Sequence, residues 1–363
     1  MAGQTKVLVV LFAMSLVAYI LQINGVNGDP QVPCFFIFGD SLVDNGNNNP
    51  LLTEAKVNYK PYGIDFGGTP TGRFNNGRTQ ADILGQLLGF DDFIPPYTTA
   101  RGNVILKGVN YASGAAGIRD ETGYQLGDII PLNEQLRNHQ ITVLRITAML
   151  RNRTAAQKYL NKCLYYVGMG NNDYLNNYFL PQFYTTALIY TPQQYAQQLI
   201  DQYRKQITRL YNLGARKVAI FGVGVIGCIP YAISTFGTNG SACVDRFNEA
   251  AQIFNTMLIS LVDELNSRYT YAKFIYVNSF GIGSGDPTSV GFTVLNVGCC
   301  PVNNIGQCIP FLTPCQNRTT YVFWDSFHPT EAVNLLTASR SYTAFLPSDT
   351  YPIDIKRLAQ LQL

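Results

Sequence analysis

The sequence is poor in histidine and in charge. Its 363 residues include only two histidines, His139 and His328. A metal centre built from several histidines is therefore excluded, and any histidine base must be one of these two residues. Charged residues make up 13% of the chain, below the roughly 25% of an average globular protein. The net charge of +3 and the lack of any lysine- or arginine-rich run argue against a nucleic-acid partner.

Apolar residues are plentiful instead. They make up 47% of the chain and include 21 phenylalanines and 23 tyrosines, which is enough for a large core and excludes a disordered protein. No internal repeat, low-complexity linker or change in composition divides the chain. We therefore expect one domain with long loops.

The N-terminus predicts export. Lys6 precedes an apolar run from Val7 to Leu21, which is shorter than the about 20 residues of a membrane span but typical of a signal peptide. Small residues before the junction place cleavage after Gly28. We therefore expect a signal peptide over residues 1–28 and a single domain over residues 29–363, with no stable membrane anchor after cleavage. The alternative is an uncleaved anchor.

The eight cysteines agree with export, because an even number in a secreted chain indicates disulfides. We expect Cys228 to pair with Cys243 across a short loop rich in glycine, proline, serine and threonine. The adjacent residues Cys299 and Cys300 would then have separate partners. The alternative, a zinc site in the C-terminal cysteine cluster, lacks paired C-x-x-C units.

Three N-x-[S/T] sequons point the same way. They lie at Asn152, Asn239 and Asn317, and none has proline in its middle position. Downstream of a signal peptide, they predict a glycoprotein that is secreted to the extracellular space.

Short apolar runs alternate with helical patterns along the chain. The runs expected to be buried strands cover residues 34–38, 108–112, 163–169, 217–221 and 273–277. Helical spacing of apolar residues is found over 79–88, 131–150, 155–160, 192–213 and 247–269, and again after Pro329. Strands separated by helices indicate βαβ units. We therefore predict an α/β fold, a three-layer α/β/α sandwich around a mainly parallel five-stranded sheet.

Polar motifs follow three of the predicted strands, where an open parallel sheet binds its ligands. They are Gly39-Asp-Ser-Leu42, Asn110-Tyr-Ala-Ser-Gly114 and Gly170-Asn-Asn-Asp173, and a fourth motif, Asp325-Ser-Phe-His-Pro329, lies near the C-terminus. Each is too short to be specific alone, but four in this order predict a functional site.

These motifs contain the parts of a nucleophilic site. Serine is a poor nucleophile near neutral pH and needs a base to take its proton. His328 is suited to that role for Ser41, and Asp325, three residues before it, can orient the imidazole. The alternatives are a capping serine and a core histidine. We expect His139, between polar neighbours on a helix, to be a solvated surface residue.

The four motifs resemble the GDSL (SGNH-hydrolase) family of esterases and lipases. Longer matches resemble the plant branch of that family: residues 36–49, 70–78, 108–114 and 321–331. The resemblance covers nearly the whole exported chain and implies the flavodoxin-like SGNH-hydrolase fold.

The resemblance also implies the groups that stabilise an oxyanion. They are the backbone N–H groups of Ser41 and Gly114 and the side-chain amide of Asn172. Gly117 in the same turn is the alternative to Gly114. Asp40 and Asp173 are expected to orient loops rather than to take part in catalysis.

These inferences predict a secreted carboxylic-ester hydrolase that uses a Ser41–His328–Asp325 triad and an acyl-enzyme. The substrate would be a lipid, a cutin-like polyester or an acetylated cell-wall ester. We expect a monomer that needs no metal and no organic cofactor. The alternatives are an acyltransferase that uses the same site and a non-catalytic binding or defence glycoprotein.

A further motif, from Gly222 to Gly227, fits the dinucleotide pattern G-x-G-x-x-G. That pattern should open a helix. Here Cys228-Ile-Pro230 follows, which argues against a dinucleotide site.

Overall fold

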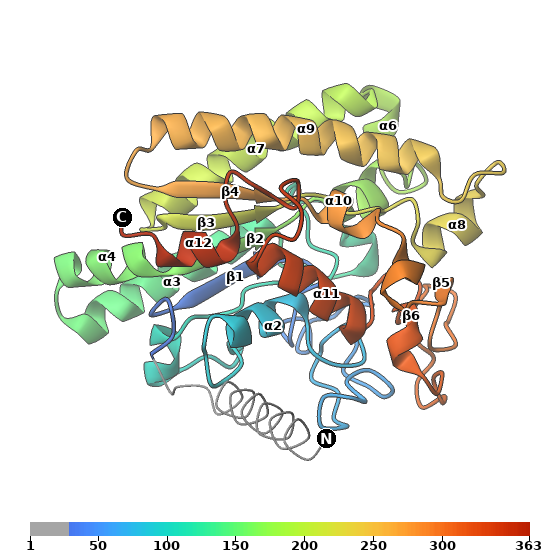
Figure 1. Cartoon of the computed structure of the whole chain (residues 1–363), viewed down its shortest axis with the longest axis horizontal. Coiled ribbons are helices and arrows are strands. Elements are labelled where there is room, and N and C mark those ends of the chain that lie inside the picture. Colours follow the sequence, from blue (N-terminus) through green and yellow to red (C-terminus); the bar gives the residue numbers. More distant parts are fainter. Residues whose placement is uncertain (1–28) are drawn as a thin grey trace, which may run out of the picture. The chain divides into compact units, whose positions relative to one another are not determined.

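A five-stranded sheet built from short buried runs lies at the centre of the structure, which is a computed structural model (Figure 1). The parallel strands β1 (Phe35–Gly39), β2 (Leu164–Gly168), β3 (Lys217–Phe221) and β4 (Lys273–Val277) pair in that order, and β7 (Thr350–Tyr351) pairs antiparallel with β4. The side chains of the parallel strands are buried almost throughout. Such strands read as continuous apolar runs because helices cover both faces of the sheet.

Helices form a layer on each side of the sheet. One layer contains α3 (Leu132–Leu150), α4 (Arg153–Lys162), α7 (Pro192–Asn212) and α9 (Asp245–Arg268). The other contains α2 (Gln80–Leu87), α10 (Ser279–Gly283), α11 (Glu331–Tyr342) and α12 (Ile355–Gln360). Alternate residues of each strand point into one layer or the other: Phe36 and Phe38 pack in the first, and Phe35 and Ile37 in the second. This is the predicted three-layer α/β/α sandwich.

Local sequence explains where two of these helices begin. Thr79 caps α2 by accepting the N–H of Asp82, whose side chain accepts the N–H of Thr79 in return. Thr191 and Gln194 form the same capping box at the start of α7, where Pro192 takes the first helical position. Both motifs satisfy N–H groups that a helix start leaves free.

The predicted elements match the structure closely, with one difference in the sheet. Residues 108–112 do not form a regular strand, although Ile37 of β1 donates to Val109 O at 3.1 Å and accepts from Tyr111 N at 2.8 Å. The pairing is irregular at its end, because the N–H of Gly39 donates to Gln135 Oε1 at 3.0 Å and not to this segment. The fifth strand is β7, which the sequence analysis did not predict.

A smaller two-stranded sheet lies outside this core. Its strands are β5 (Val294–Gly298) and β6 (Tyr321–Phe323). The remaining short helices are α5 (Asn171–Asp173), α6 (Thr186–Ile189) and α8 (Pro230–Phe236), the π-helical turn η3 (Tyr174–Tyr178), and the 3-10 turns η1 (Gly102–Leu106), η2 (Tyr124–Leu126), η4 (Pro287–Val290) and η5 (Arg318–Thr320).

Four disulfides join the eight cysteines. They are Cys34–Cys163, Cys228–Cys243, Cys299–Cys315 and Cys300–Cys308. The predicted pairing of Cys228 with Cys243 is confirmed, and so are the separate partners of Cys299 and Cys300.

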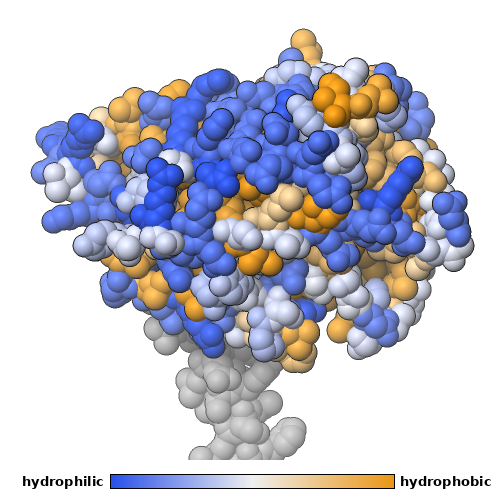
Figure 2. Space-filling view, turned by 90° about the horizontal axis from the view of Figure 1, so that it is seen from above, coloured by the Kyte–Doolittle hydropathy of each residue, from blue (hydrophilic) through white to orange (hydrophobic). Residues whose placement is uncertain are grey.

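The structure describes residues 29–363, of which residues 31–363 form one compact unit. The predicted signal peptide, residues 1–28, lies outside the described residues. Within residues 29–363, no helix combines the length and the apolar composition that crossing a bilayer requires. Figure 2 shows that hydrophilic side chains cover much of the face seen from above, while apolar side chains form separate patches.

Candidate active site

The crossover pattern of the sheet leaves a crevice at the end of β1. The segment around Asn110 lies on one side of β1 and β2 lies on the other. The helices that follow β1 and this segment, α2 and α3, cover opposite faces of the sheet. A ligand of an open α/β sheet binds at such a switch point, beyond the carboxyl ends of the strands. Ser41 lies there, two residues after β1.

Three of the predicted site residues meet at this crevice. His328 Nε2 lies 2.9 Å from Ser41 Oγ, although the two residues are 287 positions apart. On the other side of the ring, His328 Nδ1 lies 2.8 Å from Asp325 Oδ2 and 2.9 Å from Oδ1. Since an ionised carboxylate only accepts hydrogen bonds, Nδ1 carries a proton and Nε2 of the neutral ring is free to accept the serine hydroxyl. The arrangement can remove a proton from Ser41.

Asp325 is completely buried, and several donors surround its carboxylate. Its Oδ1 accepts the backbone N–H groups of Phe327 and His328, each at 2.8 Å. Its Oδ2 accepts the hydroxyl of Tyr62 at 2.7 Å. Donors around both oxygens offset the cost of burying the charge and fix the plane of the carboxylate. The sequence analysis did not identify Tyr62, since none of the recognised motifs contains it.

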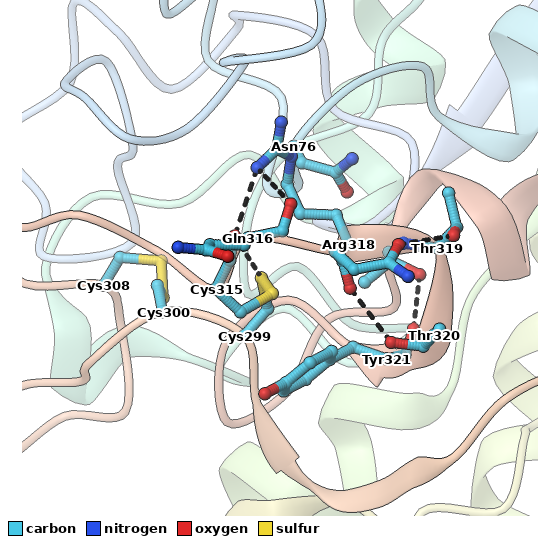
Figure 3. Close-up of a disulfide and its surroundings, with 12 residues drawn as sticks. Asn76, Cys299, Cys300, Cys308, Cys315, Gln316, Arg318, Thr319, Thr320 and Tyr321 are labelled. Atoms are coloured by element: carbon cyan, nitrogen blue, oxygen red, sulfur yellow. Dashed lines mark hydrogen bonds between the residues drawn. A yellow bond between two sulfur atoms is a disulfide. The ribbon is translucent and has the colours of Figure 1, made fainter.

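The loop that carries Asp325 and His328 follows β6 of the small sheet and lies next to two disulfides. Figure 3 shows both disulfides together with Tyr321, the first residue of β6. After β5, the N–H of Cys299 donates to Phe323 O and that of Cys300 to Trp324 O, both at 3.0 Å. The partners of these two cysteines, Cys308 and Cys315, follow within 16 residues. His328 and Asp325 are therefore held by hydrogen bonds to a covalently closed segment.

The segment after Asn110 supplies the opposite side of the crevice. The N–H of Gly114 donates to Asp44 Oδ2 at 3.0 Å, so this amide is not free to meet a substrate oxygen, contrary to our expectation. Gly114 has a packing role instead, because a Cβ there would lie 2.6 Å from Phe74 Cζ. The next residue, Ala115, has a φ of +63° and lines the cavity beside Ser41. Within the described residues, neither the Ser41 N–H nor the Ala115 N–H has a hydrogen-bond acceptor.

Asn172 lies on the same side of the crevice and lines the same cavity. One hydrogen of its amide is donated to Ala116 O at 3.1 Å, which leaves the other available to a ligand. Its Oδ1 accepts from Asn176 Nδ2 at 2.7 Å, and Asn176 Oδ1 accepts from Gln125 Nε2 at 2.9 Å. This chain of amides fixes which way the Asn172 side chain faces.

Buried carboxylates hold the backbone on this side. Asp44 accepts three N–H groups, those of Gly46, Asn47 and Gly114. Asp173 accepts two N–H groups and the hydroxyl of Thr122 from the turn that follows Ala115. Burial raises the pKa of Asp44 and that of Asp173 to about 6, although these hydrogen bonds act to lower both pKa values.

Asp40 also accepts backbone and side-chain donors. Its Oδ1 takes the N–H of Leu42 and its Oδ2 the amide of Asn171. Burial raises the pKa of Asp40. Its contacts fix the turn that carries Ser41.

A cavity of about 250 Å³ opens beside Ser41 and His328. Its apolar lining includes Ala55, Phe74, Leu126, Leu180, Phe183 and Phe327. Its polar lining includes the carboxylate of Glu54, the hydroxyl of Tyr231 and the amides of Gln125, Asn172, Asn176, Gln182, Asn304 and Gln307. Such a cavity can hold an acyl chain or another uncharged group, with amides available for hydrogen bonds.

The expectation for His139 is wrong, because this residue is completely buried. Its ring lies edge-on to those of Phe36, Phe38 and Tyr165, and its Nδ1 is 3.1 Å from the hydroxyl of Tyr111. Burial among aromatic rings lowers the pKa of His139 to about 3. It lies in the helical layer rather than in the crevice, so His328 is the histidine available to Ser41.

The glycine pattern at Gly222–Gly227 follows β3 but opens no helix directly. A turn and the Cys228–Cys243 disulfide follow it, and α8 begins only at Pro230. The helix terminus that a pyrophosphate group would need is absent at this place.

The fold and the site together define an ester hydrolase with an α/β fold and a serine at the switch point of the sheet. A model of the GDSL-like lipase/acylhydrolase family matches residues 35–341, which is most of the chain. The chain belongs to this family and is an ester hydrolase, as the resemblance predicted.

Relatives from Arabidopsis thaliana match over nearly the full length. The chain is 56% identical to GDSL esterase/lipase At1g29670 over 337 residues, which cover 91% of this chain and 92% of the relative. It is 55% identical to GDSL esterase/lipase At1g29660 over 342 residues, which cover 93% and 94%.

Proposed function

We propose that the protein is a secreted carboxylic-ester hydrolase in which Ser41, His328 and Asp325 form the catalytic triad. One observation carries this proposal: the 2.9 Å contact between His328 Nε2 and Ser41 Oγ at the wall of the cavity. Contact of a nucleophile with its base, and of the base with an orienting carboxylate, is the geometric signature of such a site.

The first half of the reaction forms an acyl-enzyme. His328 Nε2 takes the proton of Ser41 as Oγ attacks the ester carbonyl, and a tetrahedral oxyanion forms. The imidazolium, stabilised by Asp325, then gives this proton to the leaving alcohol. In the second half, His328 takes a proton from water, and the hydroxide attacks the acyl group. The acid leaves as the proton returns to Ser41.

We assign three donors to the developing oxyanion. They are the free N–H groups of Ser41 and Ala115 and the second amide hydrogen of Asn172. Ala115 takes the role that we first gave to Gly114. Donors fixed in advance stabilise the transition state at little reorganisation cost, and one donor is worth roughly 3–4 kcal/mol in other acyl-transfer enzymes.

The substrate is a lipid, cutin-like or acetylated cell-wall ester. The apolar wall of the cavity supports an acyl chain as one part of it, and the amides support a polar part. A screen of the purified protein against short- and long-chain esters and acetylated sugars distinguishes these substrates.

The test of the triad is covalent labelling. A fluorescent phosphonate should modify Ser41 in the folded protein, and Ser41→Ala should lose labelling and roughly 10⁴- to 10⁶-fold of the ester hydrolysis. Folded, secreted protein that the probe leaves unmodified would count against the proposal. Product analysis with an added alcohol shows whether water or an alcohol accepts the acyl group.

The pH dependence follows from the same mechanism. Protonated His328 cannot accept the serine proton, so hydrolysis should fall as the pH drops and this histidine becomes protonated. A rate that stayed constant far below the range in which histidine titrates would contradict the role of His328 as base.

Export and glycosylation complete the proposed function. Asn152, Asn239 and Asn317 are all exposed, so an oligosaccharide transferase could reach each of them. Treatment of the secreted protein with an N-glycosidase should lower its mass and convert the modified asparagines to aspartate. We propose that the exported protein is a monomer, which light scattering tests directly.

A further inference from the structure

We propose that Tyr62 is a positioning residue that holds the Asp325 carboxylate and thereby sets the pH at which His328 becomes a base. The inference rests on the proposed triad. It adds a fourth side chain that contacts neither the substrate cavity nor Ser41.

The direction of the Tyr62 hydrogen bonds follows from its partners. Its hydroxyl lies 2.7 Å from Asp325 Oδ2 and 3.0 Å from the backbone nitrogen of Cys308. The N–H of Cys308 can only donate, and a carboxylate can only accept. The hydroxyl of Tyr62 therefore accepts from Cys308 and donates to Asp325. Tyr62 is completely buried, so water does not compete for this bond.

The donors around Asp325 divide between its two oxygens. The backbone N–H groups of Phe327 and His328 both reach Oδ1, whereas Tyr62 reaches Oδ2. Without Tyr62, Oδ2 would have only the imidazole as a partner. Tyr62 therefore keeps the carboxylate from turning about its bond and shares the negative charge that faces His328.

Packing and a disulfide fix Tyr62 in turn. Its ring meets that of Trp324 at 71° and that of Tyr59 at 89°. Cys308, whose N–H the hydroxyl accepts, is bonded to Cys300, and the N–H of Cys300 donates to Trp324 O next to Asp325. Tyr62, the disulfide and the Asp325 loop thus form a closed ring of contacts.

The effect on His328 has a definite sign. A hydrogen bond to a carboxylate stabilises its charge and reduces the charge available to a neighbouring cation. When that donor is removed, more negative charge acts on the imidazolium, which favours the protonated form of His328. The acid limb of kcat/KM should then move to higher pH.

Two other titratable groups interact with His328 or Asp325, and Tyr62→Phe leaves both of them in place. Asp40, on the turn after β1, interacts with the charge of His328, and Tyr59 interacts with that of Asp325. Tyr59 donates its own hydroxyl to Gln307 Oε1 at 3.1 Å and not to Asp325. Tyr59→Phe is therefore a matched control, since it removes the same group three residues away.

The experiment compares Tyr62→Phe, Tyr59→Phe and the full wild-type chain in pH profiles of ester hydrolysis. Rates are normalised to the fraction of enzyme that a phosphonate titrates. We expect Tyr62→Phe to lower kcat roughly tenfold, as loss of one hydrogen bond to a charged group does, with KM unchanged. In Tyr62→Phe, the acid limb of the pH profile should lie about half a pH unit or more above that of the wild type. In Tyr59→Phe, it should stay at the wild-type pH.

A double-mutant cycle separates positioning from folding. If Tyr62 acts through Asp325, Tyr62→Phe should not lower kcat further in an Asp325→Ala background. 4-Aminophenylalanine in place of Tyr62 keeps a donor at the same reach and should restore the wild-type limb, and it also provides the test if Tyr62→Phe does not fold. An unshifted acid limb in Tyr62→Phe or an unrestored limb with the amino analogue overturns the inference, as do additive losses in the cycle. Failure of the triad itself would instead appear as hydrolysis that survives Ser41→Ala.

Discussion

The two sides of the crevice are held in different ways. Ser41, Ala115 and Asn172 form a nucleophile side, which is attached to the main sheet and held by buried carboxylates and amides. Asp325 and His328 form a base side, which lies outside the main sheet and is hydrogen-bonded to a segment, residues 299–315, that two disulfides close. The nucleophile side therefore depends on the protonation of Asp44 and Asp173, whereas the base side depends on covalent bonds. The contacts that support the nucleophile side are therefore sensitive to pH, and those that support the base side are sensitive to reduction of the disulfides.

The largest effect is expected on the base side. Asp325→Asn keeps the shape of the side chain but offers an amide where His328 needs an acceptor for its Nδ1 proton. We expect kcat to fall by roughly 10⁴-fold, because the imidazole then takes the wrong tautomer. Thermal unfolding checks that the variant is folded, and a loss below tenfold would mean that Asp325 does not orient the base.

A smaller loss is expected on the nucleophile side. Asn172→Ala removes one oxyanion donor and should lower kcat by roughly 10²- to 10³-fold with little change in KM. Asn176→Ala leaves that donor in place and removes only its support, so its effect should be smaller. Steady-state kinetics of both variants show which one loses more kcat. An equal or larger loss in Asn176→Ala would show that the amide chain, and not Asn172 itself, carries the effect.

Removal of a disulfide should separate the two sides. Cys300→Ala with Cys308→Ala opens the ring that supports Tyr62 and Asp325, and we expect roughly a tenfold loss of kcat. Cys34→Ala with Cys163→Ala is the control, because that disulfide joins the residues that precede β1 and β2, at the end of the sheet opposite to the site. Both pairs should lower the stability by about 2–4 kcal/mol, but only the first should lower kcat per titrated site.

The smallest effect on catalysis is expected at His139. The pKa of His139 is about 3 in the folded protein, below the ordinary value of 6.5, so the unfolded chain takes up the proton first. Stability of the wild type is thus lost as the pH falls below 6.5, by about 1.4 kcal/mol per unit, until the folded pKa is reached. His139→Gln has no imidazole to protonate, so it should not show this loss of stability.

Denaturant unfolding of both proteins at several pH values measures the difference. As the pH falls, the free energy of unfolding of His139→Gln should increase relative to that of the wild type. The variant should hydrolyse esters almost normally near pH 7. The opposing contributions of Asp44 and Asp173 are the same in both proteins and cancel. A stability difference that does not change with pH would show that His139 is not neutral in the folded state.

Much of the main sheet could be predicted from the sequence because its strands are buried on both faces. Apolar runs located β3 and β4 to the residue. β7 was missed because it has only two residues, Thr350 and Tyr351, and no apolar run. Residues 108–112 were apolar enough to predict a strand, but the bond from Gly39 to the Gln135 side chain, 96 residues away, was not visible in the pattern.

The base side was accessible through its motif, since Asp325 and His328 lie three residues apart. Tyr62 was not, because its partners are 246 and 263 residues away along the chain. On the nucleophile side, the positive φ of Ala115 has no sequence signal, so glycine next to it was the natural choice for a donor.

The sequence around His139 contains a pattern that indicates burial, but its polar neighbours pointed to the surface. Its neighbours Asn138 and Gln140 are polar, yet Leu132, Leu136 and Ile146 of the same helix are buried at helical spacing from it. Spacing along α3 rather than adjacent residues would have predicted that His139 faces the core.

The distance in sequence between Ser41 and His328 also fixes when the site can exist. The proposed nucleophile is translated early and its proposed base 287 residues later. A nascent chain thus carries Ser41 without a partner for most of its synthesis. The enzyme cannot cleave esters until almost all of it has left the ribosome.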